Sequence, residues 1–582
     1  MRSLTRHVSH RLHHPPARPA TGHSSSPNAY TQLAMGKRFR ACEACHALKI
    51  KCDPSLAEPG CCERCVRTST TCVPAARRWQ RDRIQELEAQ VAQLQLALDE
   101  TRAASVSAGR CTRDTSVGSS DHGSGDKMLA FLDALVDLSA QARALTVYAH
   151  HVHSAWPVIS LGTGTSDSQI LSMRDEFPIT LVAILAFALT SHDVQVDAQT
   201  QQVLRQRVAD VVGAAMTTQA CSHDLIQASL VAAFWVRPAF DTNCYRLIAL
   251  AIDMGVDFGL GGDSMPSSPP AWFGRHRGPL SPGMARSWLG AYVGSKFASI
   301  STRRQDAHCW GPSHDSAFNL LEQQPEGNHL LLEITRIAHL QATLANDLAL
   351  CDANVYRDMN SEIVRASRSA VRERIEAIER NLPPWLAQDH QLRFLRLQSV
   401  ILSNEPVLHT TSNKAFFGAP YIAARIGVHD FACPDEITPV VQDALLSLVR
   451  ACHDAIDVVA RVPTAELLNL TTLCFASSVT YNLALLVKVH VAVSAPGNSY
   501  GQIMTRQQLN VRQAMEKLKQ VNAALVALDP RMDNWNTRII GAAAWLETWL
   551  VDYESIVQRF EHTLQRGAAE EAMGSLSPSG FF

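Results

Sequence analysis

The sequence predicts a mainly α-helical protein with a small cysteine-rich module near its N-terminus. Amphipathic stretches with helical periodicity recur through the larger, C-terminal part of the chain, and no series of alternating strands joined by hairpin turns is present. Of the 582 residues, 46% are hydrophobic, which is enough to bury a sizeable core. We therefore expect a large all-α domain over residues 128–565.

Seven of the fifteen cysteines fall within residues 42–72, and six of them have the spacing C-x2-C-x6-C-x9-C-x2-C-x6-C. Thiolates are good zinc ligands, and a C-x-x-C pair can offer two sulfurs to one tetrahedral ion at about 2.3 Å. The array repeats one half-site, and six sulfurs can complete two tetrahedral sites only if two of them bridge. By position the bridging residues are Cys42 and Cys62. The predicted ligands of two structural Zn²⁺ ions are Cys42, Cys45, Cys52, Cys62, Cys65 and Cys72.

The remaining cysteines have simpler interpretations. Cys61 directly precedes Cys62 and is the alternative to it as a ligand; otherwise it is a spare thiol. The other eight contain no C-x-x-C pair and are expected to be ordinary buried thiols. A disulfide framework belongs to short secreted chains, and we identify no signal peptide.

The segment Cys42–Asp53 resembles the fungal binuclear zinc-cluster transcription factors, whose first half reads Cys-x-x-Cys-Arg-x-x-Lys-x-Lys-Cys-Asp. Lys49 and Lys51 occupy the two lysine positions, whereas His46 replaces the arginine and Leu48 fills a slot that is often basic. The resemblance implies a DNA-binding module over residues 35–75 that reads a CGG-like triplet, with Lys49 as the base reader. The candidate DNA contacts are Lys49, Lys51, His46, Arg64, Arg67, Arg77 and Arg78.

The charge distribution favours a nucleic-acid partner. Residues 35–83 hold eleven Lys and Arg against five Asp and Glu, although the whole chain has a net charge of only −2. The same basic residues form a candidate nuclear-import signal. Residues 1–34 hold four arginines and no acid, and are expected to be a disordered basic tail. A mitochondrial transit peptide and a translation start at Met35 are the alternatives.

Residues 76–101 combine a basic linker with a short heptad pattern. Branched residues at the a positions and leucine at the d positions favour a parallel two-stranded coiled coil, and hence a homodimer. Packing of this stripe on the helical domain is the alternative. The predicted seam consists of Ile84, Leu87, Val91, Leu94 and Leu98.

A flexible linker is expected over residues 102–127, because they are rich in Ser, Gly and charge. Within the helical domain, Val364, Val371, Ile375, Ile378 and Leu382 lie on one helical face. Thr438 followed by Pro439 predicts the start of another helix, which continues to Arg461. Two stretches, residues 224–235 and 245–260, resemble a helix pair of the same family's regulatory region, and residues 286–289 resemble its next helix less closely.

The C-terminal part carries two ambiguous stretches. The uncharged run from Leu467 to Val487 is interpreted as a buried helix rather than a membrane span, because it contains several Asn, Ser and Thr residues. The segment from Trp545 to Tyr553 is interpreted as a packed terminal helix, with an activation segment as the alternative. Residues 566–582 are expected to be a disordered tail.

No P-loop, nucleophile elbow, zinc-protease motif or dinucleotide fingerprint is found, so we expect no enzyme activity. His308, Cys309 and His314 are too weak a pattern to predict a second metal site.

Together these features predict a nuclear, dimeric, sequence-specific regulator of genes transcribed by RNA polymerase II, and a pathway-specific regulator of a metabolic gene cluster is one form of it. Its expected partners are double-stranded DNA, a second copy of the chain and transcription co-regulators, with no membrane. The departures at His46 and Leu48 keep an alternative open: a zinc-stabilised protein-interaction or corepressor factor without base readout.

Overall fold

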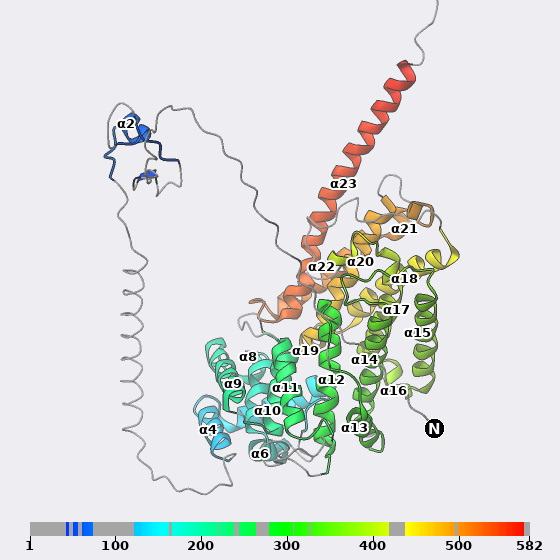
Figure 1. The fold of residues 1–582 in the computed structure, drawn as a ribbon. Helices are drawn as coiled ribbons and strands as arrows, with labels where there is room; N and C mark the ends of the chain where they lie inside the picture. The colour runs from blue at the N-terminus through cyan, green and yellow to red at the C-terminus, as the bar shows by residue number, and fades with distance from the viewer. Residues whose placement is uncertain are drawn as a thin grey trace, which may run out of the picture. The chain divides into compact units, whose positions relative to one another are not determined.

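The computed structural model describes residues 42, 44–45, 51–55, 61–73, 122–161, 166–218, 220–237, 244–262, 279–306, 308–324, 327–417, 437–494 and 499–574 (Figure 1). The chain divides into two compact units, residues 1–117 and 118–582. The expected mainly α class is confirmed, since the described residues contain no strand beyond an isolated bridge between Pro54 and Cys62. The predicted coiled-coil seam at residues 84–98 lies outside the described part of the chain.

The second unit begins with α4 (His122–Asp133), within the segment expected to be a linker. That expectation is wrong for residues 122–127, because Met128 and Leu132 anchor this helix in the core and its first turn extends before them. The elements that follow are α5 (Leu138–Val147), η1 (Tyr148–His153), α6 (Ser166–Glu176), α7 (Pro178–Ala183), η2 (Ile184–Ala188), α8 (Ser191–Val194) and α9 (Ala198–Thr218).

Helix α10 (His223–Phe234) lies at the centre of this first group, with every side chain from Asp224 to Phe234 buried. The carboxylate of Asp224 accepts hydrogen bonds from the backbone N–H groups of Ile179, at 2.9 Å, and Thr180, at 2.7 Å. These are two of the N–H groups that the first turn of α7 leaves without an intrahelical acceptor, so α10 caps α7 from outside.

Helix α11 (Cys244–Asp257) packs on α10, and α12 (Pro282–Thr302) contacts both. These three helices cover the stretches that resemble the regulatory region. Helix α12 is buried around its whole circumference, and its close approach to its neighbours depends on two glycines. A Cβ atom at Gly290 would lie 2.9 Å from Val158 Cβ, and one at Gly294 would lie 3.0 Å from Phe234 Cζ.

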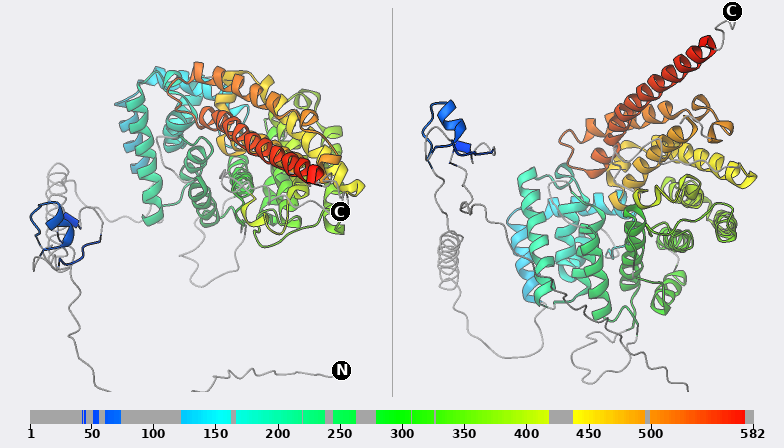
Figure 2. Two further views of the ribbon diagram at one scale, coloured as in Figure 1. Left: turned by 90° about the horizontal axis from the view of Figure 1, so that it is seen from above. Right: turned by 45° about the horizontal axis from the view of Figure 1, so that its top comes forward.

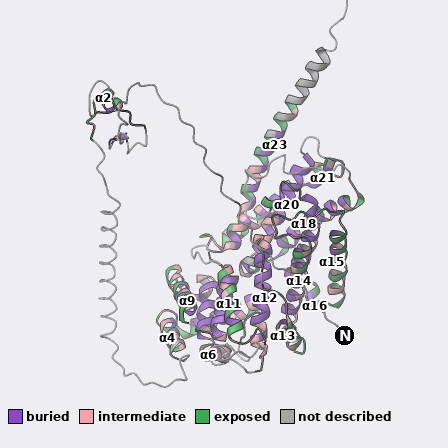
Figure 3. Ribbon diagram, in the orientation of Figure 1, coloured by how far each residue is buried: buried purple, intermediate pink, exposed green. Residues whose placement is uncertain are grey.

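The middle of the unit consists of α13 (Pro312–Glu322), α14 (His329–Asp347), α15 (Glu362–Asn381), α16 (Pro384–Ala387), α17 (His390–Asn404), η4 (Glu405–Leu408) and η5 (Lys414–Phe416). The predicted amphipathic helix is confirmed as α15, whose Val364 and Val371 are buried. Helix α18 (Pro439–Arg461) is confirmed at both ends, and the Thr438 side chain accepts a hydrogen bond from Val441 N. Figure 3 colours the buried residues of these helices purple, and they belong to one hydrophobic core cluster.

The C-terminal elements are α19 (Thr464–Asn469), η8 (Thr472–Ala476), α20 (Ser477–Ser494), η9 (Ser499–Gln502), α21 (Arg506–Leu509), α22 (Val511–Leu528) and α23 (Trp535–Gly574). The stretch from Leu467 to Val487 is largely buried, as expected, but it is not one helix: it breaks between α19 and α20. No helix in the described ranges is long and apolar enough to cross a membrane.

The terminal helix α23 packs through Leu546, Leu550 and Tyr553, as predicted. It continues to Gly574, so the expected tail from residue 566 is wrong as far as residue 574. Figure 2 shows the C-terminal part of α23 extending beyond the neighbouring helices α20 and α22.

Candidate metal centre

The cysteines of the first unit converge in two groups of four. One group consists of Cys42, Cys45, Cys52 and Cys62, and the other of Cys42, Cys62, Cys65 and Cys72. Within each group all sulfurs lie within 4.8 Å of one another. Cys42 and Cys62 belong to both groups, whereas Cys61 belongs to neither.

The distances between sulfurs fit a tetrahedral thiolate site. Cys42 Sγ lies 3.8 Å from Cys62 Sγ and 3.7 Å from Cys65 Sγ, and Cys45 Sγ lies 3.7 Å from Cys62 Sγ. Sulfurs bound at about 2.3 Å to one tetrahedral zinc ion are separated by about 3.8 Å. A disulfide would bring two sulfurs to about 2.0 Å, and all six cysteines are free thiols. The donor set and its spacing therefore fit zinc.

The two half-sites share a local geometry as well as a spacing. The backbone N–H of Cys42 donates to Cys52 Sγ at 3.3 Å, and the N–H of Cys62 donates to Cys72 Sγ at the same distance. Both bonds span ten residues. Such N–H···S bonds stabilise thiolate charge and orient the ligand. The two half-sites that repeat in the sequence therefore also share the same backbone-to-sulfur hydrogen bond.

A short helix, α2 (Glu63–Arg67), positions the second half-site. Cys62 is its N-cap residue, and Cys62 Sγ accepts a hydrogen bond from Cys65 N at 3.4 Å. This hydrogen bond lowers the pKa of Cys62 to about 6, which favours the thiolate that a metal requires. Two backbone bonds, Ser55 N to Cys61 O and Glu63 N to Asp53 O, connect the end of the first half-site to the start of the second.

Two of the basic side chains in the described part of this unit, Lys51 and Arg67, are exposed. Lys51 is 86% exposed although its Nζ lies 3.1 Å from Asp53. On α2, Arg67 is exposed and Arg64 half-buried. The other predicted DNA contacts, His46, Lys49, Arg77 and Arg78, lie outside the described residues.

In the second unit, no further group of metal-ligating side chains is found among the described residues. His308 Nε2 lies 3.2 Å from His314 Nε2, and both rings pack against Trp288. Burial lowers the pKa of His314 to about 4, which keeps it neutral at physiological pH. Cys309 is exposed and does not join them.

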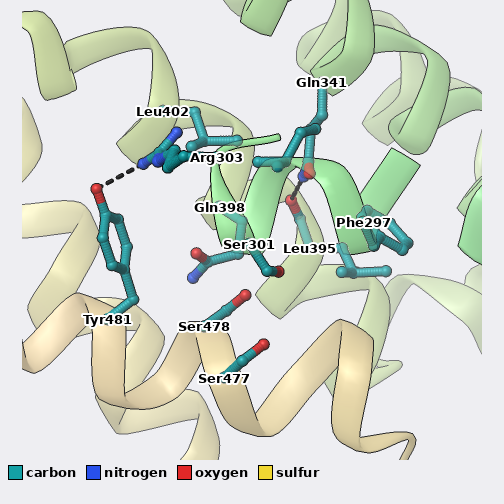
Figure 4. A pocket seen from close by; sticks show the side chains of 11 residues that line it. Phe297, Ser301, Arg303, Gln341, Leu395, Gln398, Leu402, Ser477, Ser478 and Tyr481 are labelled. Atoms are coloured by element: carbon teal, nitrogen blue, oxygen red, sulfur yellow. Dashed lines mark hydrogen bonds between the residues drawn. The ribbon is translucent and has the colours of Figure 1, made fainter. Parts of the chain in front are cut away.

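The second unit contains a buried charged cluster that the sequence did not predict. Arg303 Nη2 lies 2.5 Å from both Glu405 Oε2 and Tyr481 Oη, and it lines a cavity of about 50 Å³ between α12, α14, α17 and α20 (Figure 4). Arg303 Nη1 and Gln398 Nε2 have no partner among the described residues. A cavity of this size and polarity has room for a few water molecules that could satisfy them.

The comparisons with known proteins point in the same direction as the cysteines. Transcription factor pbcR of Emericella nidulans is 25% identical over 375 residues, which is 54% of this chain and 49% of that protein. The chain thus spans about half the length of this relative. No family model and no solved structure matches the chain. The chain is therefore similar to a fungal transcription factor and carries a cysteine cluster able to bind metal.

Proposed function

We propose that this protein is a zinc-stabilised, sequence-specific DNA-binding regulator of genes transcribed by RNA polymerase II, acting in the nucleus and without enzyme activity. The observation that carries the proposal is the pair of four-sulfur groups that share Cys42 and Cys62. The similarity to a named transcription factor supports it independently.

Two zinc ions per chain would be held by Cys42, Cys45, Cys52, Cys62, Cys65 and Cys72, with Cys42 and Cys62 as bridging ligands. Zinc supplies folding free energy here and no reaction chemistry. A module of about forty residues buries too little apolar surface to fold alone, whereas structural zinc contributes roughly 10 to 16 kcal/mol per ion in small modules. The thiolates also carry negative charge, which Arg64 and Lys51 are close enough in sequence to offset.

Lys49 is proposed as the base reader of a CGG-like half-site, and Lys51, Arg64 and Arg67 as phosphate contacts. The exposure of Lys51 and Arg67 supports their part of this assignment. Dimerisation through Ile84, Leu87, Val91, Leu94 and Leu98 would place two modules on paired half-sites.

Binding of the full-length protein to a selected duplex and to its scrambled counterpart, titrated with salt, tests this function. A lysine that bonds guanine O6 and N7 contributes about 1 to 3 kcal/mol of base discrimination, whereas a phosphate contact treats all sequences alike. Lys49→Ala should therefore lower affinity for the selected duplex far more than for the scrambled one. Arg67→Ala should weaken both similarly.

A wild-type protein that does not distinguish the two duplexes would instead support the second candidate, a zinc-stabilised protein-interaction or corepressor factor. The substitutions at His46 and Leu48 relative to the family pattern are the observation that favours this candidate.

A further inference from the structure

A cavity of about 420 Å³ lies in the second unit where the η2–α9 region meets the segment between α22 and α23. One wall comes from residues 190–205 and Arg237, and the other from Leu468 and residues 528–534. The cavity therefore joins parts of the chain that are almost 300 residues apart in sequence, as the separation between Arg237 and Asp529 shows. Its volume is within the range of about 300 to 1,000 Å³ that is typical of small-molecule sites.

Two buried arginines line this cavity. Arg205 and Arg237 are each only 4% exposed. Arg205 Nε donates to Ala186 O at 2.8 Å and its Nη2 to Gln201 Oε1 at 2.8 Å. Arg237 Nε donates to Phe187 O at 2.8 Å and its Nη2 to Leu189 O at 3.1 Å. All these acceptors are neutral.

Neither guanidinium forms an ion pair with a carboxylate in the described part of the chain. The acidic residues on the cavity wall are engaged elsewhere or stand farther away. Asp529 accepts hydrogen bonds from Asp533 N, Asn534 N and Thr537 Oγ1, at the start of α23. Asp197 accepts from Thr200 N and Oγ1 at the start of α9. Burial, and after it the charge of Arg205, lowers the pKa of Arg237 to about 10, against a smaller opposing effect of Asp529, Asp533 and Asp193, none of which forms an ion pair with it.

The hydrogen bonds to backbone carbonyl groups do not by themselves explain why Arg205 and Arg237, two charged side chains, are buried here. Gln201 lies on the same wall and donates through Nε2 to Leu185 O and Leu189 O, so a neutral amide already performs that role here. A buried cation without a carboxylate at ion-pair distance is costly, and a counter-charge placed against it lowers that cost. The open space beside the two guanidiniums is where such a counter-charge fits.

We propose that this cavity binds a small organic carboxylate, with its carboxylate group against Arg205 and Arg237 and its apolar part against Leu468 and Leu528. Guanidinium groups match carboxylates in geometry and charge. Asp533 lines the same cavity and would favour an amino group on the ligand. A simple carboxylic acid and an amino acid both carry the carboxylate group that the two arginines would bind.

A ligand bound in the cavity would strengthen the packing between the first helices of the unit and α23. Polar contacts already join the two sides through α19: Trp235 Nε1 donates to Asn469 O at 2.9 Å, and Asn536 Nδ2 of α23 donates to Leu467 O at 2.8 Å. A ligand that contacts Arg237 on one side and the residues before α23 on the other would add to them. The site is independent of the DNA-binding proposal.

Isothermal titration calorimetry on the full-length protein, at constant ionic strength, tests the proposal with three probes that share one branched alkyl chain. Isocaproate carries a carboxylate, L-leucine carries a carboxylate and an amine, and isoamylamine carries the amine alone. We expect saturable binding of isocaproate or L-leucine and none of isoamylamine. Tighter binding of L-leucine than of isocaproate would identify an amino acid, and the reverse a simple carboxylate.

Three variants complete the test. Arg237→Gln should weaken carboxylate binding about tenfold or more, because a charge-assisted hydrogen bond is lost. Ala198→Phe should block binding by filling the cavity while both arginines remain in place. Arg396→Gln, a matched change at a buried arginine on α17, should bind as the wild type does. The proposal is overturned if neither carboxylate binds, if isoamylamine binds equally well, or if Ala198→Phe and Arg237→Gln both retain wild-type affinity.

Discussion

Arg303 and Glu405 form a buried ion pair, with Arg303 Nη2 2.5 Å from Glu405 Oε2 and side-chain exposures of 10% and 1%. Burial alone would raise the pKa of Glu405, but the charge of Arg303 and a hydrogen bond from His409 hold that pKa well below its usual range. Arg303 adopts a left-handed backbone conformation, with φ of 55°, at the end of α12. The pair connects α12 to the segment after α17.

Removal of one partner should destabilise the helical unit strongly. Arg303→Met leaves Glu405 as an uncompensated buried charge, which typically costs about 3 to 5 kcal/mol. Arg506→Met breaks a half-exposed pair with Glu561 and should cost about 1 kcal/mol or less. Urea unfolding, monitored by far-UV circular dichroism, measures the stability loss of both variants. If the two variants lose the same free energy of unfolding, the buried ion pair is dispensable for stability.

Two glycines in helices should respond to alanine in opposite directions. At Gly290 on α12, the new Cβ would lie 2.9 Å from Val158 Cβ, and overpacking of this kind costs about 1 to 3 kcal/mol. At Gly213 on α9, nothing lies within 4 Å of the new Cβ, so Gly213→Ala should stabilise the protein by roughly 0.5 to 1 kcal/mol. Thermal unfolding of both variants checks the sign. A Gly290→Ala variant as stable as Gly213→Ala would refute the close packing of α12.

The helical unit should lose stability as the pH falls from 7 to 5. Burial lowers the pKa of four histidines, His153, His314, His409 and His490, to about 4. Their pKa in the unfolded chain is about 6.5, so between these values the unfolded state binds more protons and protonation favours unfolding. Each histidine should contribute on the order of 1 to 2 kcal/mol of lost stability at pH 5.

Urea unfolding of the wild type and of His153→Phe at pH 7 and pH 5 tests this dependence. His153 Nδ1 has no hydrogen-bond partner among the described residues, so the ring can be replaced without breaking a contact of that atom. The variant should lose less stability than the wild type between the two pH values. An identical loss in both proteins would mean that His153 does not titrate with unfolding.

The sequence predicted the features that depend on neighbouring residues. Cysteine spacing indicated the cluster because each pair of ligands is close along the chain, and the Thr438–Pro439 pair predicted the start of α18 because a helix cap is local. The buried pair Arg303–Glu405 and the cavity beside Arg205 and Arg237 could not be predicted, because their members come together only through helix packing. The break between α19 and α20 was missed because an uncharged apolar run has the same composition whether it is one helix or two.

The zinc content of the purified full-length protein is the direct test of the proposed two-ion cysteine cluster. Elemental analysis should give two zinc ions per chain, two also for Cys61→Ser, and fewer for Cys62→Ser, because Cys62 belongs to both four-sulfur groups and Cys61 to neither. One zinc ion or none in the wild type, or a full complement in Cys62→Ser, would contradict the two-ion cluster.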